Sequence, residues 1–129
     1  VGDLNEFCSE VPNWFSISKH PHRNCIYDEI KAVVKLKGID LNDAFDQHRR
    51  YDIDGFPKNF GLGENGVMLR DLSDKKVHDI CDMWWDEYSK GIKRDQCSLM
   101  YCFWKLGYMP DLFSQSIFNK YFVCHRKHG

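Results

Sequence analysis

The chain has 129 residues, a formal net charge of −1 and 15% aromatic residues. This length suits one domain with a core of its own, and the balanced charge excludes a nucleic-acid partner held by a broad basic surface. No apolar run reaches the length that a membrane-spanning helix needs, so we expect no membrane-spanning segment in this chain.

Cysteine usage gives an expectation about the compartment. The six cysteines have no compact regular spacing, and two of them, Cys97 and Cys102, lie in a predicted helix beside apolar neighbours. We interpret them mostly as buried free thiols and expect a reducing, cytoplasmic location, with a disulfide framework as the alternative. The full set is Cys8, Cys25, Cys81, Cys97, Cys102 and Cys124.

The first part of the chain predicts one strand and two helices. Large apolar and small polar residues alternate over 14–18, which is the period of a strand. Apolar residues then share one stripe over 26–37, which predicts a helix that stops at Gly38. Asp40 is the expected N-cap of a second helix.

The middle of the chain predicts a loop, a strand and a third helix. Turn-forming residues dominate 54–66, and a short buried strand is expected over 67–70. Ser73 or Asp74 would cap the helix that follows, whose apolar residues recur at helical spacing.

The last part leaves the sheet incomplete. Asp95 is a plausible cap for a fourth helix over 96–106, which is apolar nearly all round and therefore buried, and 108–129 is ambiguous. Two short strands do not make a stable sheet alone. Either 116–124 adds strands, or the chain is the second part of a larger α/β domain, which is the interpretation that we favour.

Two adjacent indoles precede a polar triplet. Trp84 and Trp85 point about 100° apart on one helix, so one of them is expected to meet a cleft or another element. Arg94, Asp95 and Gln96 follow where the next helix begins, and they place a donor, a carboxylate and an amide together, as a hydroxylated ligand would need. Helix capping alone also explains Asp95, and both interpretations stay open at this point.

A second group of polar residues follows the first strand. His20 and Arg23 lie at the end of that strand, where ligands usually dock in α/β sheets, and they suit a phosphate or a carboxylate. A solvated basic loop is the alternative. His20 and His22 form a His-x-His pair, but no Cys or carboxylate lies at metal-ligand spacing. The helix dipole is sufficient to explain Asp28 and Glu29.

Near the C-terminus, His125 and His128 flank an Arg-Lys pair. Either histidine could supply one ligand to a divalent ion, and a tail without such a role is the alternative.

In their order along the chain, these pieces resemble a glycosyltransferase-like family that includes bacterial capsular-polysaccharide enzymes and plant proteins linked to cell-wall or mucilage synthesis. The resemblance extends from about Asp3 to Gly107 and depends on the ordered set, because no single piece is specific. Cys97 stands where Leu is more usual after the Arg-Asp-Gln triplet. The matching pieces are Ile17–Glu29, Gln47, Tyr51, Asp54–Pro57, Leu62, Val67–Arg70, Trp84–Glu87 and Arg94–Ser98.

The family looks like a branch of the GT-A glycosyltransferases. The resemblance therefore implies an α/β chain with a GT-A-like nucleotide-diphospho-sugar transferase fold that lacks the N-terminal nucleotide-binding strands. In such enzymes an Asp-x-Asp-like motif binds a divalent ion, Mn or Mg, and the diphosphate of a sugar nucleotide. The motif is expected just upstream of a segment like Val1–Leu4, so residues 1–129 would form a single domain, the C-terminal, acceptor-side part of the enzyme.

The resemblance also implies roles for the candidate residues. Asp95 would be the catalytic carboxylate, which takes the proton of the acceptor hydroxyl or stabilises positive charge on the sugar. The substrate-binding candidates are Arg94 and Gln96 beside it, Trp84 and Trp85 as the wall of the cleft, and His20 and Arg23 near the phosphates. His125 would complete a metal shell, as the C-terminal His of some GT-A enzymes does.

We accordingly expect a transfer of sugar from a nucleotide-sugar donor to a glycan acceptor. The alternative is a non-catalytic carbohydrate- or protein-binding module that kept the fold. A third possibility is an incomplete gene product with no activity of its own.

Overall fold

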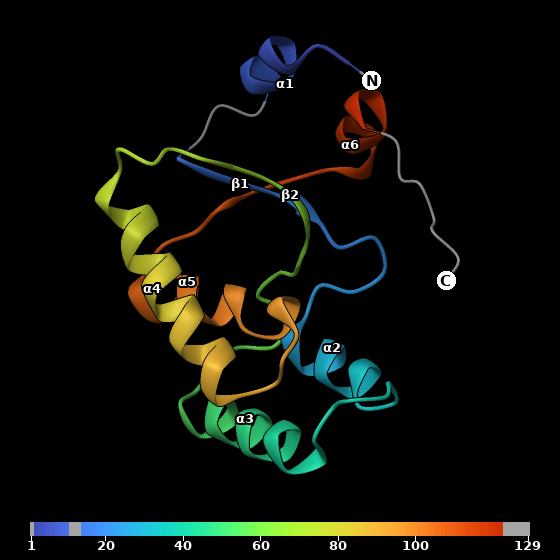
Figure 1. Cartoon of the computed structure of the whole chain (residues 1–129), viewed down its shortest axis with the longest axis vertical. Helices are drawn as coiled ribbons and strands as arrows, with labels where there is room; N and C mark the ends of the chain where they lie inside the picture. Colours follow the sequence, from blue (N-terminus) through green and yellow to red (C-terminus); the bar gives the residue numbers. More distant parts are fainter. Residues whose placement is uncertain (1, 11–13, 123–129) are drawn as a thin grey trace.

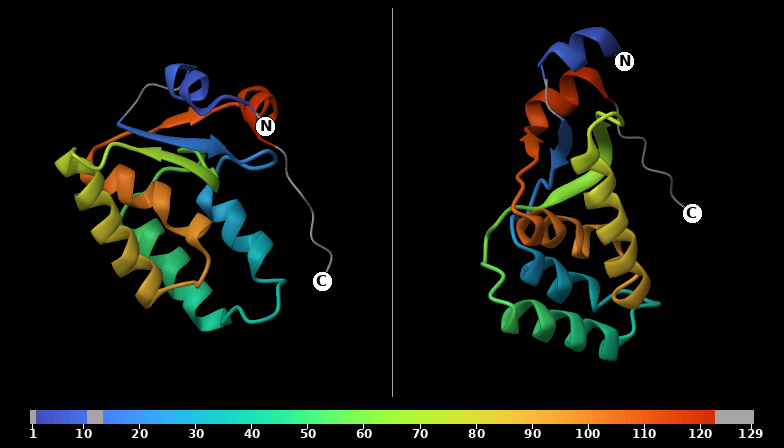
Figure 2. Two further views of the ribbon diagram at one scale, coloured as in Figure 1. Left: turned by 45° about the horizontal axis from the view of Figure 1, so that its top comes forward. Right: turned by 90° about the vertical axis from the view of Figure 1, so that its left-hand side faces the viewer.

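A three-stranded sheet crosses the fold, with helices on both of its faces (Figures 1 and 2). The structure is a computed structural model, and it describes residues 2–10 and 14–122. β1 (Phe15–Lys19) is the central strand, β2 (Gly63–Arg70) pairs with it antiparallel, and β3 (Asp111–Phe113) pairs with it parallel on the other side. The chain therefore forms a mixed α/β domain.

β1 is central because it pairs with a strand along each of its edges, and both of its faces are covered. Phe15 and Ile17 lie in the main core, while Ser16 and Ser18 are also fully buried on the opposite face. The predicted strand over 14–18 is thus confirmed within one residue. β2 begins at Gly63, earlier than the predicted strand at 67, and a Cβ at Gly63 would lie 2.8 Å from Ile17 Cγ2.

The larger helical layer packs on the Phe15 and Ile17 face. Buried apolar residues of this layer and of the sheet form one core, in which the rings of Phe15 and Phe103 meet edge to face at 5.0 Å. The layer consists of α2 (Ile26–Val33), α3 (Leu41–Ile53), α4 (Lys75–Lys90) and α5 (Leu99–Leu106).

The other face of the sheet carries a smaller layer, made by α1 (Leu4–Glu10) and α6 (Gln115–Tyr121) (Figure 1). Phe7, Phe113 and Tyr121 form its separate buried cluster. Sequence reasoning did not predict α1. The alternative of strands over 116–124 is wrong for the described part of that range, because residues to Tyr121 are helical and the third strand precedes them.

The helix termini confirm two predicted N-caps and correct the end of one predicted helix. Asp40 accepts from the backbone N–H groups of Asn42 (2.8 Å) and Asp43 (3.3 Å), and Asp74 accepts from Lys76 (2.9 Å). The predicted helix over 26–37 ends earlier, at Val33.

The predicted fourth helix over 96–106 is shorter, and Asp95 is not its cap. A 3₁₀ turn, η1 (Asp95–Cys97), comes first, and α5 begins only at Leu99. Asp95 lies inside η1 and its side chain makes no capping bond; Arg94 occupies the position before the turn.

The cysteines are free thiols throughout the described residues, as expected: Cys8, Cys25, Cys81, Cys97 and Cys102 form no disulfide. Cys25, Cys97 and Cys102 are buried, whereas Cys8 is exposed. The cytoplasmic location stays a prediction, and Cys124 lies outside the described residues.

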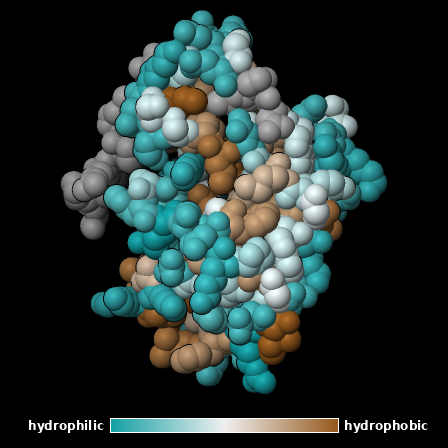
Figure 3. Space-filling model, turned by 180° about the vertical axis from the view of Figure 1, so that it is seen from behind, coloured by the Kyte–Doolittle hydropathy of each residue, from teal (hydrophilic) through white to brown (hydrophobic). Residues whose placement is uncertain are grey.

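Within residues 2–10 and 14–122, no helix is both long enough and apolar enough to cross a membrane. Apolar side chains do reach the surface at the lower end of the molecule, where α3 lies (Figure 3). Leu41, Phe45 and Ile53 of α3 are among the exposed large apolar residues.

Candidate functional site

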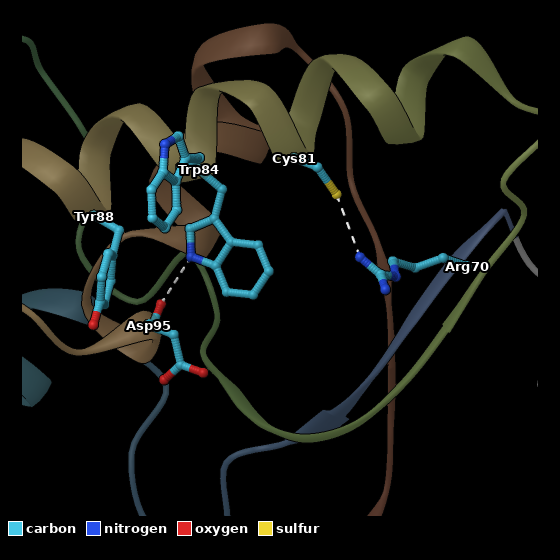
Figure 4. Close-up of a pocket in the computed structure, with 6 residues that line it drawn as sticks. Arg70, Cys81, Trp84, Tyr88 and Asp95 are labelled. Carbon is cyan, nitrogen blue, oxygen red and sulfur yellow. Dashed lines mark hydrogen bonds between the residues drawn. The ribbon is translucent and has the colours of Figure 1, made fainter.

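The candidate residues fall into two groups on either side of η1. The first group surrounds a cavity of about 270 Å³ between α4, η1 and the end of β2. We call it the aromatic cavity, and it is lined by Arg70, Cys81, Trp84, Trp85, Tyr88 and Asp95 (Figure 4). The second group lies in a polar pocket after β1, lined by Lys19, His20, Pro21, His22, Arg23 and Asn24.

The two indoles face differently, as the helical geometry requires. Trp84 is half-buried, and its Nε1–H donates to the backbone carbonyl of Asp95 at 3.2 Å. Trp85 is 70% exposed, and its ring stacks on that of Tyr88 with 6.0 Å between centroids and 20° between planes. One indole therefore fixes η1 to α4, while the other presents an open ring face.

Asp95 has a free carboxylate. Its side chain is exposed and lines the aromatic cavity, and within the described residues it makes no hydrogen bond or ion pair. Figure 4 shows the carboxylate close to the Trp84 indole. Since it serves no cap, the carboxylate is available to a ligand.

The neighbours of Asp95 point elsewhere. Gln96 Nε2 donates to the backbone carbonyl of Glu64 at 2.6 Å, which ties η1 to β2 instead of facing the cavity. Arg94 is exposed and does not line the aromatic cavity. The structure therefore brings together Asp95, Trp84 and Trp85, but not the whole Arg-Asp-Gln triplet.

One buried side chain holds both ends of the loop that carries Asp95. Gln47 Oε1 accepts from the Ile92 N–H at 2.8 Å, and Gln47 Nε2 donates to the Cys97 carbonyl at 2.9 Å. Gln47 is 1% exposed, and a Cβ at Gly91 would clash with its Oε1. The resemblance named Gln47 without a role, and sequence spacing gave no sign of this contact.

Beneath the polar pocket lies a buried carboxylate, Glu29, which the helix dipole alone explained at the level of the sequence. Glu29 is 2% exposed, accepts from Arg23 Nε at 2.7 Å, and lies 3.5 Å from His20 Nε2. His20 Nδ1 accepts from the backbone N–H groups of His22 and Arg23, each at 3.1 Å. The proton of the neutral His20 ring therefore lies on Nε2 and faces Glu29.

Burial sets the protonation of the groups near η1. Desolvation lowers the pKa of His20, and the attraction of Glu29 offsets only part of this effect. Burial and the nearby Glu29 carboxylate raise the pKa of the Cys97 thiol to about 12, so this thiol is not a nucleophile at neutral pH.

Sequence reasoning missed three residues of the aromatic cavity. Tyr88 and Cys81 belong to the apolar residues at helical spacing that predict α4, and Arg70 ends the predicted strand over 67–70; the sequence predicts no functional role for any of the three. The available signal was a charged residue at the end of the predicted strand over 67–70, but the contact of Arg70 with Cys81 is not visible in the spacing.

The described residues do not provide a metal site. Within residues 2–10 and 14–122, no three His, Cys, Asp or Glu side chains are grouped so that they could hold an ion. Both His20 nitrogens already have partners in the chain. His125 lies outside the described residues, so its role and the Mn or Mg expected for the complete enzyme stay predictions.

A cavity lined mainly by aromatic side chains, with a few polar groups at its edge, has the composition of a small-molecule binding site. The model of the TOD1/MUCI70 glycosyltransferase-like domain family matches residues 4–128, and the chain belongs to this family. Neither the curated proteins nor the solved structures include a significant match to the chain. The family match confirms the resemblance to a glycosyltransferase-like family.

Proposed function

We propose that the chain is the acceptor-side part of a GT-A-like glycosyltransferase, which transfers sugar from a nucleotide-sugar donor to a glycan acceptor. The observation that carries the proposal is the free Asp95 carboxylate at an aromatic cavity. Membership of a glycosyltransferase-like family supports it.

The proposed chemistry needs a base where the acceptor hydroxyl binds. The hydroxyl oxygen forms a bond to the anomeric carbon of the donor sugar, and the nucleoside diphosphate leaves with the electron pair of the bond that breaks. The hydroxyl proton passes to the Asp95 carboxylate, which has no competing partner among the described residues. Trp84 and Trp85 would hold the sugar ring and keep water from it.

The developing charge on the diphosphate needs cations. Arg23 is one candidate, because Glu29 fixes its Nε and leaves the terminal nitrogens of a partly exposed side chain free. We propose that His20 supports this loop in its neutral form, and that Arg94 adds a solvent-exposed positive charge.

The test is Asp95→Asn in the full-length protein, with transfer measured from radiolabelled nucleotide sugars. We expect turnover to fall by about 10²–10⁴-fold, the usual contribution of a general base. Asp82→Asn is the matched control, because Asp82 is an exposed aspartate of α4 that does not line the cavity. Near-normal turnover in Asp95→Asn would remove Asp95 from the mechanism.

A binding module without catalysis is the second candidate, favoured by the exposed Trp85 ring at the aromatic cavity, which suits a sugar ring whether or not transfer follows. Titration of the chain with free oligosaccharides, and separately with nucleotide sugars and Mn²⁺, distinguishes the two. Oligosaccharide binding with no response to nucleotide or metal supports the binding module.

A further inference from the structure

Arg70 brings an unpaired positive charge to the aromatic cavity. Its side chain is exposed, its Nη1 lies 3.5 Å from Cys81 Sγ, a weak contact, and it forms no ion pair within the described residues. By contrast, Arg23 and Arg50 both pair with buried carboxylates. Figure 4 shows the Arg70 side chain reaching from β2 toward Cys81, across the cavity from Trp84.

The cavity is small and mostly apolar apart from Arg70 and Asp95. Its volume of about 270 Å³ lies just below the range of roughly 300–1,000 Å³ found for drug-sized ligands, which fits one sugar ring better than a whole nucleotide. The open face of Trp85 and the Trp84 indole are suited to the apolar face of a pyranose.

The two charges occupy different sides of this cavity (Figure 4). An anionic group on the sugar gains from the guanidinium of Arg70, which donates in a planar fork that matches a carboxylate or phosphate. The same group placed beside Asp95 would be repelled. Charge therefore selects one orientation of a charged ring, with an uncharged hydroxyl left beside Asp95.

We propose that the aromatic cavity binds a pyranose carrying an anionic group, with Arg70 as the residue that pairs with the anion. The inference deepens the proposed function and rests on it, because it names the charge of the sugar that this site accepts. The anion is either the carboxylate of a sugar acid in the glycan or the phosphate on the anomeric carbon of the donor sugar.

The test is direct binding to the full chain, measured by NMR titration with three matched probes: methyl glucoside, methyl glucuronide and glucose 1-phosphate. We expect one anionic probe to bind about tenfold more tightly than methyl glucoside, as a charge-assisted hydrogen bond allows. Tighter binding of the glucuronide assigns the anion to a sugar acid, and tighter binding of glucose 1-phosphate assigns it to the donor phosphate.

Substitution isolates the role of Arg70. Arg70→Gln should reduce the affinity of the preferred anionic probe to that of methyl glucoside, while the affinity for methyl glucoside stays unchanged. Arg49→Gln, which alters an exposed arginine of α3 outside the cavity, should keep the preference. Equal binding of the three probes, no binding of any, or a preference that survives in Arg70→Gln overturns the inference.

The outcome is separable from that of the proposed function. If Asp95→Asn abolishes transfer but the wild type shows no anion preference, the catalytic proposal stands and the role of Arg70 is wrong. If the anion preference depends on Arg70 but Asp95→Asn transfers sugar normally, the binding site stands and the catalytic role of Asp95 is wrong.

Discussion

At the scale of single residues, His20 shows how burial and hydrogen bonds set one protonation state. Its Nδ1 accepts from two backbone N–H groups. Protonation of the ring would turn Nδ1 into a donor, which would then face these two N–H groups and lose both hydrogen bonds. The charged groups around it are Glu29, Arg23, His22 and Glu64. Desolvation outweighs the attraction of the carboxylates, so the pKa of His20 is lowered in the folded chain.

The lowered pKa predicts a loss of stability on acidification. The unfolded chain binds a proton at His20 near pH 6.5, and the folded chain binds it only at lower pH. The His20 contribution is therefore complete above about pH 6.5 and is lost as the pH falls below it. We expect the free energy of unfolding, measured in urea, to fall less between pH 7 and pH 5 in His20→Asn than in the wild type.

The control is His78→Asn, because His78 is exposed and its ring hydrogen-bonds only to the Leu72 carbonyl, at 2.7 Å, among the described residues. The free energy of unfolding should fall less between pH 7 and pH 5 in His20→Asn than in His78→Asn. If His20→Asn gave a curve as steep as the wild-type curve, the buried neutral state of His20 would not be the cause.

Asp95 allows a second prediction at this scale, because the structure removes its expected capping role. Loss of a capping Asp lowers the free energy of unfolding, whereas loss of an Asp that serves only a ligand leaves it nearly unchanged. Asp95→Ala should change the free energy of unfolding by less than about 0.5 kcal/mol, as for other exposed positions. Asp40→Ala should cost about 1 kcal/mol, because Asp40 accepts from two N–H groups at the start of α3. Thermal or urea unfolding of both variants checks the contrast, and a comparable loss in Asp95→Ala would restore the capping interpretation.

At the scale of elements, the loop before α5 depends on α3 more than on its own sequence. Gln47 satisfies Ile92 N–H and the Cys97 carbonyl at the same time, and its amide also contacts Tyr51 Oη at 3.2 Å. Tyr51 donates in turn to Glu87 Oε1 at 2.8 Å. A chain of buried polar contacts thus joins α3, α4 and the segment that carries Asp95.

Gln47→Leu should destabilise the chain by about 2–4 kcal/mol, because it leaves two buried backbone groups without partners. The hydrogen-exchange protection of residues 92–97 should fall more than that of β1. Gln115→Leu is the matched control, since Gln115 makes one exposed bond to the Lys19 carbonyl at 3.2 Å and should change stability little. Equal losses in the two variants would show that Gln47 does not hold the loop.

The elements differ in how far the sequence could predict them. β1, α3 and α4 follow from local patterns and caps, and these were predicted nearly in place. α1 depends on packing against the sheet through Phe7, which no local pattern reveals, whereas α6 has a local signal that the prediction missed, the N-cap Ser114, which accepts from the Ile117 N–H at 3.3 Å. η1 replaces the first turn of the predicted helix where Gln47 binds the Cys97 carbonyl, a contact between residues 50 positions apart.

The candidate site follows the same division. Trp84, Trp85 and Asp95 were predicted together because they lie close in the sequence, and the structure places all three around one cavity. Arg70 reaches the same cavity from another strand, and Glu29 pairs with Arg23 across a helix start. Both of these contacts depend on the fold, so the sequence predicts the residues but not what each of them contacts.

At the scale of the whole molecule, the sheet separates two unequal cores. The larger core supports α4, η1 and the aromatic cavity, while the smaller one consists of Phe7, Phe113 and Tyr121 with their neighbours. Phe7 contacts Phe113 and Tyr121 edge to face at 5.4 and 5.5 Å. The aromatic cavity should therefore keep its geometry when the smaller core is weakened.

Phe7→Ala tests this independence. Loss of a buried phenylalanine costs about 3–5 kcal/mol in a well-packed core, and we expect the lower end here because the cluster is small. Hydrogen-exchange protection should fall in α1 and α6, while the NMR signal of the Trp84 Nε1–H, which is bonded to the Asp95 carbonyl, keeps its position and protection. Phe103→Ala, in the larger core, should lower the protection of α1 and α6 and also change the Trp84 signal. A change of the Trp84 signal in Phe7→Ala equal to that in Phe103→Ala would show that the two cores unfold as one unit and that the small layer also sets the shape of the cavity.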